Sequence, residues 1–199
     1  MIIGICGLIG CGKGTAADIL VEQHGFTKIS FADKLKDGVA EIFGWDRAML
    51  EGDTDVSRTW REQRDNFWSD ETQMEVTPRL VLQLFGTDCM RNGFHDGVWV
   101  SLLKKTILDN PEQNYVIPDV RFENEINMIR SIGGEVWEVR RNGDPRWLVD
   151  YETTGKEPTN IHPSEWRWVK ARKDHVLQND GTIEDLKHQV LGRLVPTRF

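Results

Sequence analysis

One stretch constrains the fold of this 199-residue chain more than any other: residues 1–20. A short apolar run rich in isoleucine, residues 1–6, is followed by three spaced glycines and then by a helical pattern with Ala16, Ile19 and Leu20 on one face. The order is therefore strand, loop, helix. Glycines let backbone N–H groups turn toward an anion, and the start of the following helix adds a partial positive charge. The stretch predicts a phosphate-binding loop at the beginning of an α/β fold.

The side chains that follow the glycines suit nucleotide chemistry. Lys13 is placed to reach the outer phosphates, and the hydroxyl of Thr15 to meet a phosphate or its Mg²⁺. The strict P-loop pattern is G-x-x-x-x-G-K-[ST], whereas here Gly14 separates the lysine from the hydroxyl. Residues 7–15 instead resemble the loop of the nucleoside monophosphate kinases, and the alternative is a tight glycine turn without a ligand. We expect the phosphates of ATP to be held by Gly10, Cys11, Gly12, Lys13, Gly14 and Thr15.

Composition argues against nucleic-acid-binding, disulfide-rich and membrane proteins. The net charge of −7 and the absence of a basic stripe argue against nucleic acid as a partner. Three cysteines give no framework of disulfide pairs and favour a reducing compartment. No apolar run is long enough to span a membrane, and the first strand begins without a signal peptide pattern. We therefore expect a cytoplasmic protein with no membrane partner.

The rest of the chain alternates between strand and helix patterns. This order predicts the α/β class and a P-loop NTPase fold, in which helices flank a parallel central sheet. After the first strand, strands are expected at 26–30, 114–119, 135–139 and 175–178. Helices are expected at 31–43, 77–86, 97–108, 122–132 and 182–194.

Two segments interrupt this order. Residues 45–76 show no sustained period and carry Trp45, Trp60 and Trp68 among charged residues. They indicate an insertion on the side of the acceptor nucleotide, and we favour tryptophans that anchor it to the core over a substrate-covering flap. Residues 141–173 are polar and irregular, as in a lid. One domain over 1–199 is expected, with its core in residues 1–44, 77–140 and 174–199.

Acidic and basic side chains gather where strands end or helices begin. Asp119 ends a buried strand and Arg121 follows it, and ligands of doubly wound sheets collect at the carboxyl ends of strands. Asp119 is therefore expected to meet Mg²⁺ through water or a substrate hydroxyl, the alternative being a helix cap. Arg121 is expected in the same crevice, the alternative being a surface ion pair. Asp33 and Lys36 either face an acceptor or lie in a solvated helix turn.

Several stretches together resemble one family, the bacteriophage deoxynucleoside monophosphate kinases. They follow the family's order and cover nearly the whole chain. Besides the loop, they are residues 31–37, 79–88, 98–100, 118–121 with Glu125, 162–165 and 178–182. The resemblance implies transfer of the γ-phosphoryl group of ATP, with Mg²⁺, to a deoxynucleoside monophosphate (dNMP), in the host cytoplasm if the protein is viral. The attacking oxygen is already anionic, so no general base is assigned, to His162 or to any other histidine.

The motifs and the resemblance together give the candidate site residues. Charge neutralisation during transfer is assigned to Lys13, Arg79, Arg91 and Arg121. Beyond the loop, ATP is expected to contact Arg140, Arg141 and Asn179. The dNMP is expected to contact Asp33, Lys36, Arg79, Gln83, Arg91, Trp99, Asp119, Arg121 and Glu125.

Two other functions fit part of the sequence. A kinase similar to dephospho-coenzyme A kinase shares the loop and the turn at 179–181, and its hydroxyl acceptor would need a carboxylate base, for which Asp33 is the candidate. A nucleotide-gated binding module could stack single-stranded bases on the eight tryptophans, although the charge of −7 opposes this. The accepted bases, the exclusion of ribonucleotides and the formation of a homodimer are left open.

Overall fold

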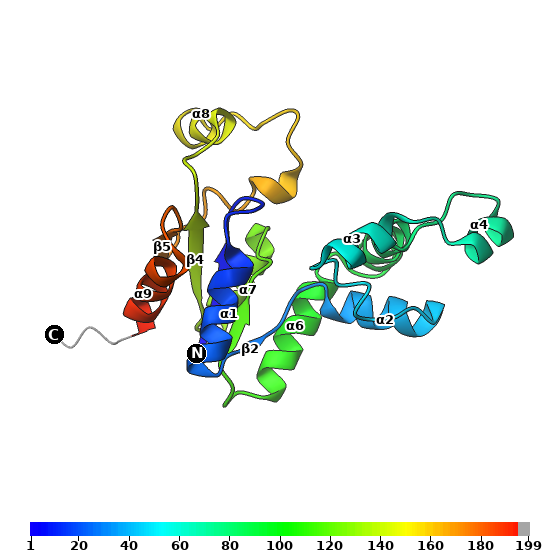
Figure 1. Ribbon diagram of the computed structural model, residues 1–199, viewed down its shortest axis with the longest axis horizontal. Coiled ribbons are helices and arrows are strands. Elements are labelled where there is room, and N and C mark those ends of the chain that lie inside the picture. The colour runs from blue at the N-terminus through cyan, green and yellow to red at the C-terminus, as the bar shows by residue number, and fades with distance from the viewer. Residues whose placement is uncertain (195–199) are drawn as a thin grey trace. The chain divides into compact units, whose positions relative to one another are not determined.

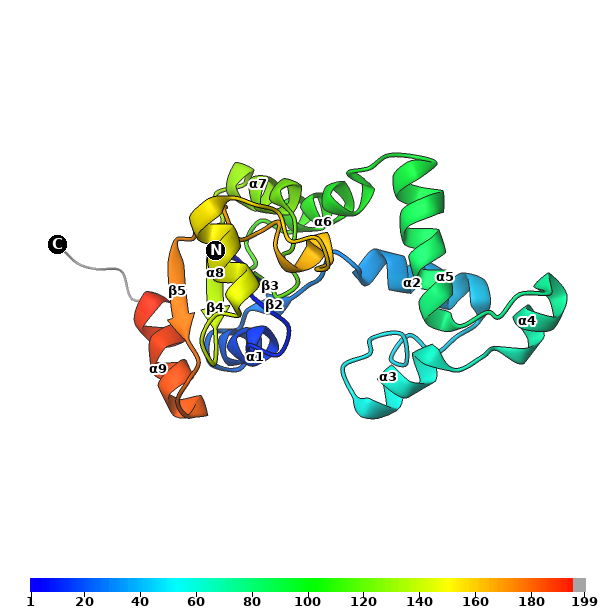
Figure 2. The ribbon, with the colours of Figure 1, turned by 90° about the horizontal axis from the view of Figure 1, so that it is seen from above.

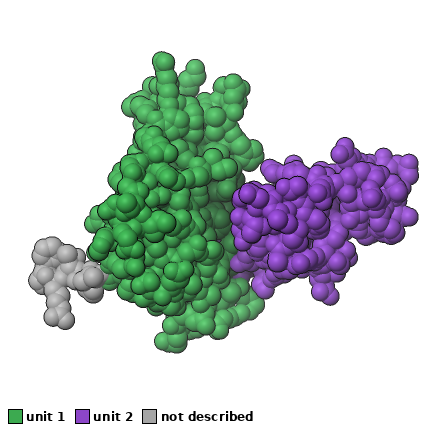
Figure 3. Space-filling model, in the orientation of Figure 1, with its two compact units in different colours: residues 1–30, 103–199 green, residues 31–102 purple. Residues whose placement is uncertain are grey.

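The computed structural model describes residues 1–194, which fall into two compact units (Figure 3). The sheet unit combines residues 1–30 with the chain from Leu103 onward, and the helical unit comprises residues 31–102. The helical unit is longer than the insertion expected at 45–76, because helices on both sides of that segment belong to it.

A five-stranded parallel sheet forms the centre of the sheet unit (Figure 1). Its order is β2-β3-β1-β4-β5, and Gly4 of the middle strand lies opposite Ile117 and Val136. The strands are β1 (Ile2–Cys6), β2 (Thr27–Lys28), β3 (Tyr115–Ile117), β4 (Glu135–Arg140) and β5 (His175–Gln178). All five expected strands are confirmed, although β2 and β3 are shorter than predicted. Every strand therefore ends at the same edge of the sheet.

Helices cover both faces of this sheet (Figure 2). Helices α1 (Lys13–His24) and α9 (Ile183–Leu194) pack together on one face, where Ile3 and Ile5 join the buried core. Helix α7 (Glu123–Ser131) covers the other face, and a Cβ at Gly4 would lie 2.5 Å from Cδ1 of Ile129. The glycine thus allows close packing between strand and helix. The predicted helices α1, α7 and α9 are confirmed.

The segment expected to be an irregular lid is partly folded. It contains α8 (Arg146–Thr154) and a short 3₁₀ helix, η2 (Pro163–Glu165). The rings of Tyr151 and Trp166 meet edge to face at 5.2 Å, and Trp168 is fully buried. The expectation of irregular structure throughout residues 141–173 is therefore wrong, because aromatic side chains spaced along the segment give it a small core.

The helical unit holds two helices that periodicity did not predict, α3 (Asp55–Glu62) and α4 (Asn66–Thr72). Both are too short for a hydrophobic period to emerge, yet both begin at capped residues: Thr54 accepts from the Ser57 N–H and Asp65 from the Trp68 N–H. The three tryptophans of this region pack around a buried cluster of Val39, Leu50, Val76 and Val81. The interpretation of the tryptophans as anchors is supported, but they anchor a cluster within this unit.

The other elements of the helical unit follow the sequence pattern more closely. Helices α2 (Asp33–Phe43), α5 (Pro78–Gln83) and α6 (Val98–Asp109) are confirmed, and α6 continues into the sheet unit. The hydroxyl of Thr77 caps α5 by accepting from the Leu80 N–H, as predicted. The helix does not stop at Gly86, however: a π-helix, η1 (Leu84–Asn92), extends it and leaves Leu84 exposed.

Candidate active site

Lys13 lies across the glycine-rich loop between β1 and α1. Its ammonium donates to the carbonyl oxygens of Gly7, at 2.9 Å, and Leu8, at 2.8 Å. The side chain is half-buried, and burial lowers the pKa of Lys13. The loop carbonyls thus hold the ammonium at the mouth of the loop, where the outer phosphates of a nucleotide are expected.

Two glycines of the loop are required by close contacts with other strands and turns. A Cβ at Gly7 would lie 2.4 Å from the carbonyl oxygen of Val139, and one at Gly12 would lie 2.3 Å from Nδ2 of Asn179. Both residues have a positive φ, 145° and 104°. Asn179 also donates through Nδ2 to the Cys11 carbonyl at 2.8 Å. The turn after β5 therefore braces the loop, and Asn179 reaches the loop's backbone.

The remaining part of the loop fits a phosphate group. Nothing lies within 4 Å of a Cβ built at Gly10 or Gly14, so the backbone there is open to an anion. Thr15 follows as an exposed residue in the first turn of α1. Open backbone at a helix N-terminus beside a lysine is the arrangement that binds phosphates.

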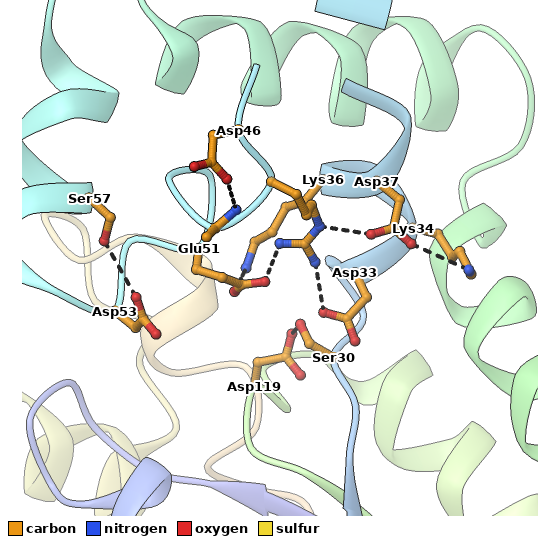
Figure 4. A network of polar contacts seen from close by, with 12 residues as sticks. Ser30, Asp33, Lys34, Lys36, Asp37, Asp46, Glu51, Asp53, Ser57 and Asp119 are labelled. Atoms are coloured by element: carbon orange, nitrogen blue, oxygen red, sulfur yellow. Dashed lines mark hydrogen bonds and ion pairs between the residues drawn. The ribbon is translucent and has the colours of Figure 1, made fainter. Parts of the chain in front are cut away.

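Arg121 and Asp119 lie beyond the carboxyl end of β3 in the same unit. Asp119 accepts a hydrogen bond of 2.6 Å from the hydroxyl of Ser30 (Figure 4). Arg121 donates through Nη1 to Glu165, at 2.8 Å, and to Ser164, at 3.3 Å. Arg121 and Glu165 both lie close enough to Lys13 to affect its pKa. Arg121 therefore forms an ion pair, as one alternative held, but near the loop rather than at a remote surface.

Ser164 and Glu165 belong to η2 and had not been expected at the site. The imidazole of His162 fixes this turn: Nδ1 lies 2.8 Å from the Ser164 hydroxyl and accepts from the Ser164 N–H at 3.3 Å. The sequence signal for them was their presence in residues 162–165, one of the stretches that carry the family resemblance. We therefore regard Ser164 and Glu165 as residues that position Arg121.

Two residues expected to contact ligands also have partners within the protein. Glu125 is 3% exposed, and its carboxylate accepts from the backbone N–H groups of Arg121, at 2.7 Å, and Phe122, at 3.0 Å. It caps α7 and shapes the turn that carries Arg121, because two backbone donors there need a partner. Its contact with the dNMP stays a prediction beside this structural role.

Arg140 is the second of these residues. Its guanidinium forms ion pairs with three carboxylates, those of Glu138 at 2.7 Å and of Asp144 and Glu152 at 2.8 Å. Glu138 is itself buried, so this arginine neutralises a charge inside the protein, and its contact with ATP stays a prediction. Arg141, the next residue, is exposed.

The other acceptor candidates belong to the helical unit. Lys36 forms an ion pair with Glu51 at 2.6 Å (Figure 4), and Arg79 an exposed one with Glu62 at 2.6 Å. Trp99 is 5% exposed and donates to the Gly86 carbonyl, so its indole N–H is used within the fold. The unit thus contains six of the residues expected to contact the dNMP: Asp33, Lys36, Arg79, Gln83, Arg91 and Trp99.

The parallel sheet and the loop carrying Lys13 define the protein's class: it has the fold of the P-loop kinases. Within this class, the chain belongs to the deoxynucleotide monophosphate kinase family, whose family model matches residues 41–190. This match spans most of the chain, including residues 41–102 of the helical unit and the segment 141–173.

Three known proteins illustrate the relationship. A protein of Acanthamoeba polyphaga mimivirus, provisionally named a deoxynucleotide monophosphate kinase, is 32% identical over 205 aligned positions, covering 96% of this chain and 95% of its own. The deoxynucleotide monophosphate kinase of Enterobacteria phage T4 is 28% identical over 58% of this chain and 44% of its own. The solved structure of TT1252 from Thermus thermophilus covers 98% of both chains with a TM-score of 0.50 at 20% identity, which shows likeness of fold alone.

Proposed function

We propose that this protein transfers the γ-phosphoryl group of ATP to a deoxynucleoside 5′-monophosphate, giving the diphosphate and ADP. Membership of the deoxynucleotide monophosphate kinase family supports this activity over that of a small-metabolite kinase. The single structural observation behind the mechanism is the proximity of two cations, Lys13 in the loop and Arg121 beyond β3. Two anionic nucleotides that react with each other need such a concentration of positive charge.

The reaction proceeds by direct displacement. An oxygen of the acceptor phosphate forms a bond to the γ-phosphorus, the bond to the β,γ-bridging oxygen breaks, and its electron pair remains on ADP. Lys13 and the open backbone near Gly10 neutralise the phosphate oxygens of ATP. No side chain needs to remove a proton, so the hydrogen bonds between His162 and Ser164 are consistent with a purely structural histidine.

Arg121 is oriented to bind a phosphate without leaving its protein partners. Within residues 1–194, its contacts with Ser164 and Glu165 both use Nη1. The opposite edge, Nη2 and Nε, can then form two parallel hydrogen bonds with phosphate oxygens. We propose that Arg121 holds the acceptor phosphate or the transferring group in this way.

Magnesium is part of the proposal. A Mg²⁺ ion at a kinase site is held mainly by phosphate oxygens and waters, and needs only one or two protein oxygens. The exposed hydroxyl of Thr15 and the carboxylate of Asp119, through water, fit that donor set. When bound, the ion neutralises phosphate charge. Among residues 1–194 there is no group of three or more metal-ligating side chains that would compete for it.

A coupled assay with ATP tests the function directly. The acceptors are the four dNMPs, their ribonucleotide counterparts and dephospho-coenzyme A. We expect ADP formation with at least one dNMP. Turnover with dephospho-coenzyme A alone would favour the small-metabolite alternative, and binding of single-stranded oligonucleotides without turnover would favour the binding module.

The Arg121→Ala variant tests the proposed orientation in the same assay. We expect the KM for the dNMP to rise about tenfold or more, the effect of losing charge-assisted hydrogen bonds, with a much smaller change for ATP. Lys28→Ala is the matched control, because Lys28 is an exposed cation of the same unit that pairs with Asp18. Equal losses for both nucleotides would move Arg121 to the ATP side.

The cellular location and oligomeric state remain predictions. No helix among residues 1–194 has the length and apolar character needed to cross a membrane. We infer action in the cytoplasm, where ATP and dNMPs are present. Light scattering on the purified protein distinguishes a homodimer from a monomer.

A further inference from the structure

Arg61 differs from every other cation of the helical unit. Six of the lysines and arginines in this unit form ion pairs with carboxylates: Lys34, Lys36, Arg47, Arg58, Arg64 and Arg79. Arg91 has an interaction of its own. Arg61 forms neither a hydrogen bond nor an ion pair with any of residues 1–194, and its Nε is buried without a partner. No motif or spacing in the sequence pointed to this arginine.

The carboxylates nearest to Arg61 already serve other cations. Glu51 pairs with both Lys36 and Arg47, and Glu62 pairs with Arg79. Burial lowers the pKa of Arg61, and the charge of Arg79 lowers it further. A half-buried cation without a partner is unfavourable, and this favours a counter-ion that is not part of the chain.

Packing rather than charge pairing holds the Arg61 guanidinium in place. It lies against the backbone at Gly52, where a Cβ would be only 2.1 Å from Cζ. Gly52 also has a positive φ of 68°, a conformation that favours glycine, and the missing side chain leaves room for the guanidinium beside the loop.

We propose that Arg61 binds the 5′-phosphate of the acceptor nucleotide, together with Arg79. The inference rests on the proposed function and adds a residue to it. A terminal monophosphate carries close to two negative charges and three oxygens, which suits the planar fork of an arginine beside a second arginine. The phosphates of ATP are assigned to the loop in the sheet unit, whereas Arg61 shares its unit with six candidate acceptor contacts.

The test compares Arg61→Met and Arg61→Lys with the control Arg64→Met. Arg64 carries the same charge in the same unit, but it is exposed and paired with Asp70. Calorimetry gives the dissociation constants for the four dNMPs and for ATP, and thermal unfolding gives the Tm without ligand. For Arg61→Met we expect dNMP binding to weaken about tenfold to a hundredfold, with ATP binding unchanged.

The Tm separates a binding role from a structural one. Removing an unpaired cation should leave the Tm of ligand-free Arg61→Met equal to or above that of the wild type. Arg61→Lys keeps the positive charge but loses the planar guanidinium that can form two parallel hydrogen bonds. It should therefore bind dNMPs with intermediate affinity. Deoxynucleosides without a phosphate should bind the wild type and both variants equally.

Three results would overturn the inference. They are a lowered Tm with unchanged dNMP affinity, an equal loss of ATP and dNMP binding, and failure of both Arg61 variants to fold. Failure of the proposed function looks different: the wild type would phosphorylate no dNMP, whatever Arg61 contributes to binding. Conversely, Arg61 variants that behave like Arg64→Met in an active kinase would remove only the inference.

Discussion

The most buried ion pairs of the two units differ in how far their carboxylates are exposed. In the sheet unit, Glu138 at the end of β4 has a side chain only 2% exposed and lies within ion-pair distance of Arg140 and Lys173. In the helical unit, pairs such as Arg79 with Glu62 have both side chains more than half exposed. Buried pairs are costly to break, whereas exposed ones contribute little. The first unit thus contains a buried charge that acts as framework, whereas the carboxylates in the described ion pairs of the second are all at least partly exposed.

The hydrophobic cores of the two units also differ, in how far apart in the sequence their residues lie. The core of the sheet unit joins segments far apart in the chain, for example Ile3 with Leu177 and Val190. The core of the helical unit comes from residues 35–85 alone and contains rings in contact, such as Phe43 stacked on Trp45 at 4.7 Å. A core built from one short segment can loosen without disturbing the sheet. This contrast predicts that different substitutions will separately affect catalysis, the stability of the sheet unit and the stability of the helical unit.

The largest effect is expected from Lys13→Ala in the loop. Turnover should fall about a thousandfold or more, since the ammonium stabilises charge that develops on the phosphate oxygens. The fold should persist, because the ammonium bonds only to atoms of the loop itself, the carbonyl oxygens of Gly7 and Leu8 and Sγ of Cys11. The measurement is kcat in the coupled assay together with the Tm. Lys28→Ala again serves as the control, and near-normal turnover in Lys13→Ala would refute the assigned role of the loop.

Glu138→Ala should have the largest effect on stability. Removing the carboxylate leaves Arg140 and Lys173 without their shared partner, a change that typically costs about 3–5 kcal/mol. Urea denaturation measures the free energy of unfolding. The control is Glu184→Ala on α9, where the glutamate is 70% exposed and pairs with Lys187. Equal effects of the two substitutions would contradict a framework role for the buried charges.

Sequence reasoning predicted most of the sheet unit for physical reasons. Buried parallel strands are continuous apolar runs, and the loop depends on local glycines and on Lys13, so both are visible in a short window. The position of Arg121 followed from the rule that strands of a parallel sheet end at one edge. The partners of Arg121 were not predictable in this way, because Glu165 reaches it across 44 residues of chain.

Sequence reasoning missed the partners that several site candidates have within the protein. The ion pairs of Arg140 were not predicted because two of the carboxylates, Asp144 and Glu152, lie in a segment expected to be irregular. The capping role of Glu125 was also missed, although its position three residues after Phe122 matches a helix cap. Arg61 was overlooked because its distinguishing property is the lack of a partner, which only the fold reveals.

Leu50→Ala tests whether the core of the helical unit can be destabilised without disturbing the sheet. Leu50 is fully buried among the aromatic residues there, and its truncation should cost about 2–3 kcal/mol, the lower part of the usual range for such a change. Hydrogen exchange should increase within residues 31–102 and remain unchanged in the sheet, with ATP affinity preserved. Val149→Ala is the control, since Val149 is an exposed apolar residue of α8. Increased exchange throughout the protein would show that the units do not open separately.

The smallest effect is expected from the ion pairs of Glu51. Burial alone would raise the pKa of this carboxyl, but the hydrogen bonds from Lys36 and Arg47 outweigh it and the net result is a lowered pKa. A lowered pKa in the folded state stabilises the protein above the unfolded-state value, about 4.3 for glutamate, and this stabilisation is lost as the pH falls further.

Glu51→Gln should therefore destabilise the protein at pH 7 by less than about 1 kcal/mol, since Glu51 is partly exposed and water screens the pairs. The difference from the wild type should shrink as the pH falls below about 4.3 and through the lowered pKa of the native carboxyl, because both side chains are then neutral. Urea denaturation at several pH values measures it, and 1 M NaCl at pH 7 should reduce it. A large, salt-insensitive loss would instead place Glu51 with Glu138 as part of a buried framework, and the contrast between the two units would fail.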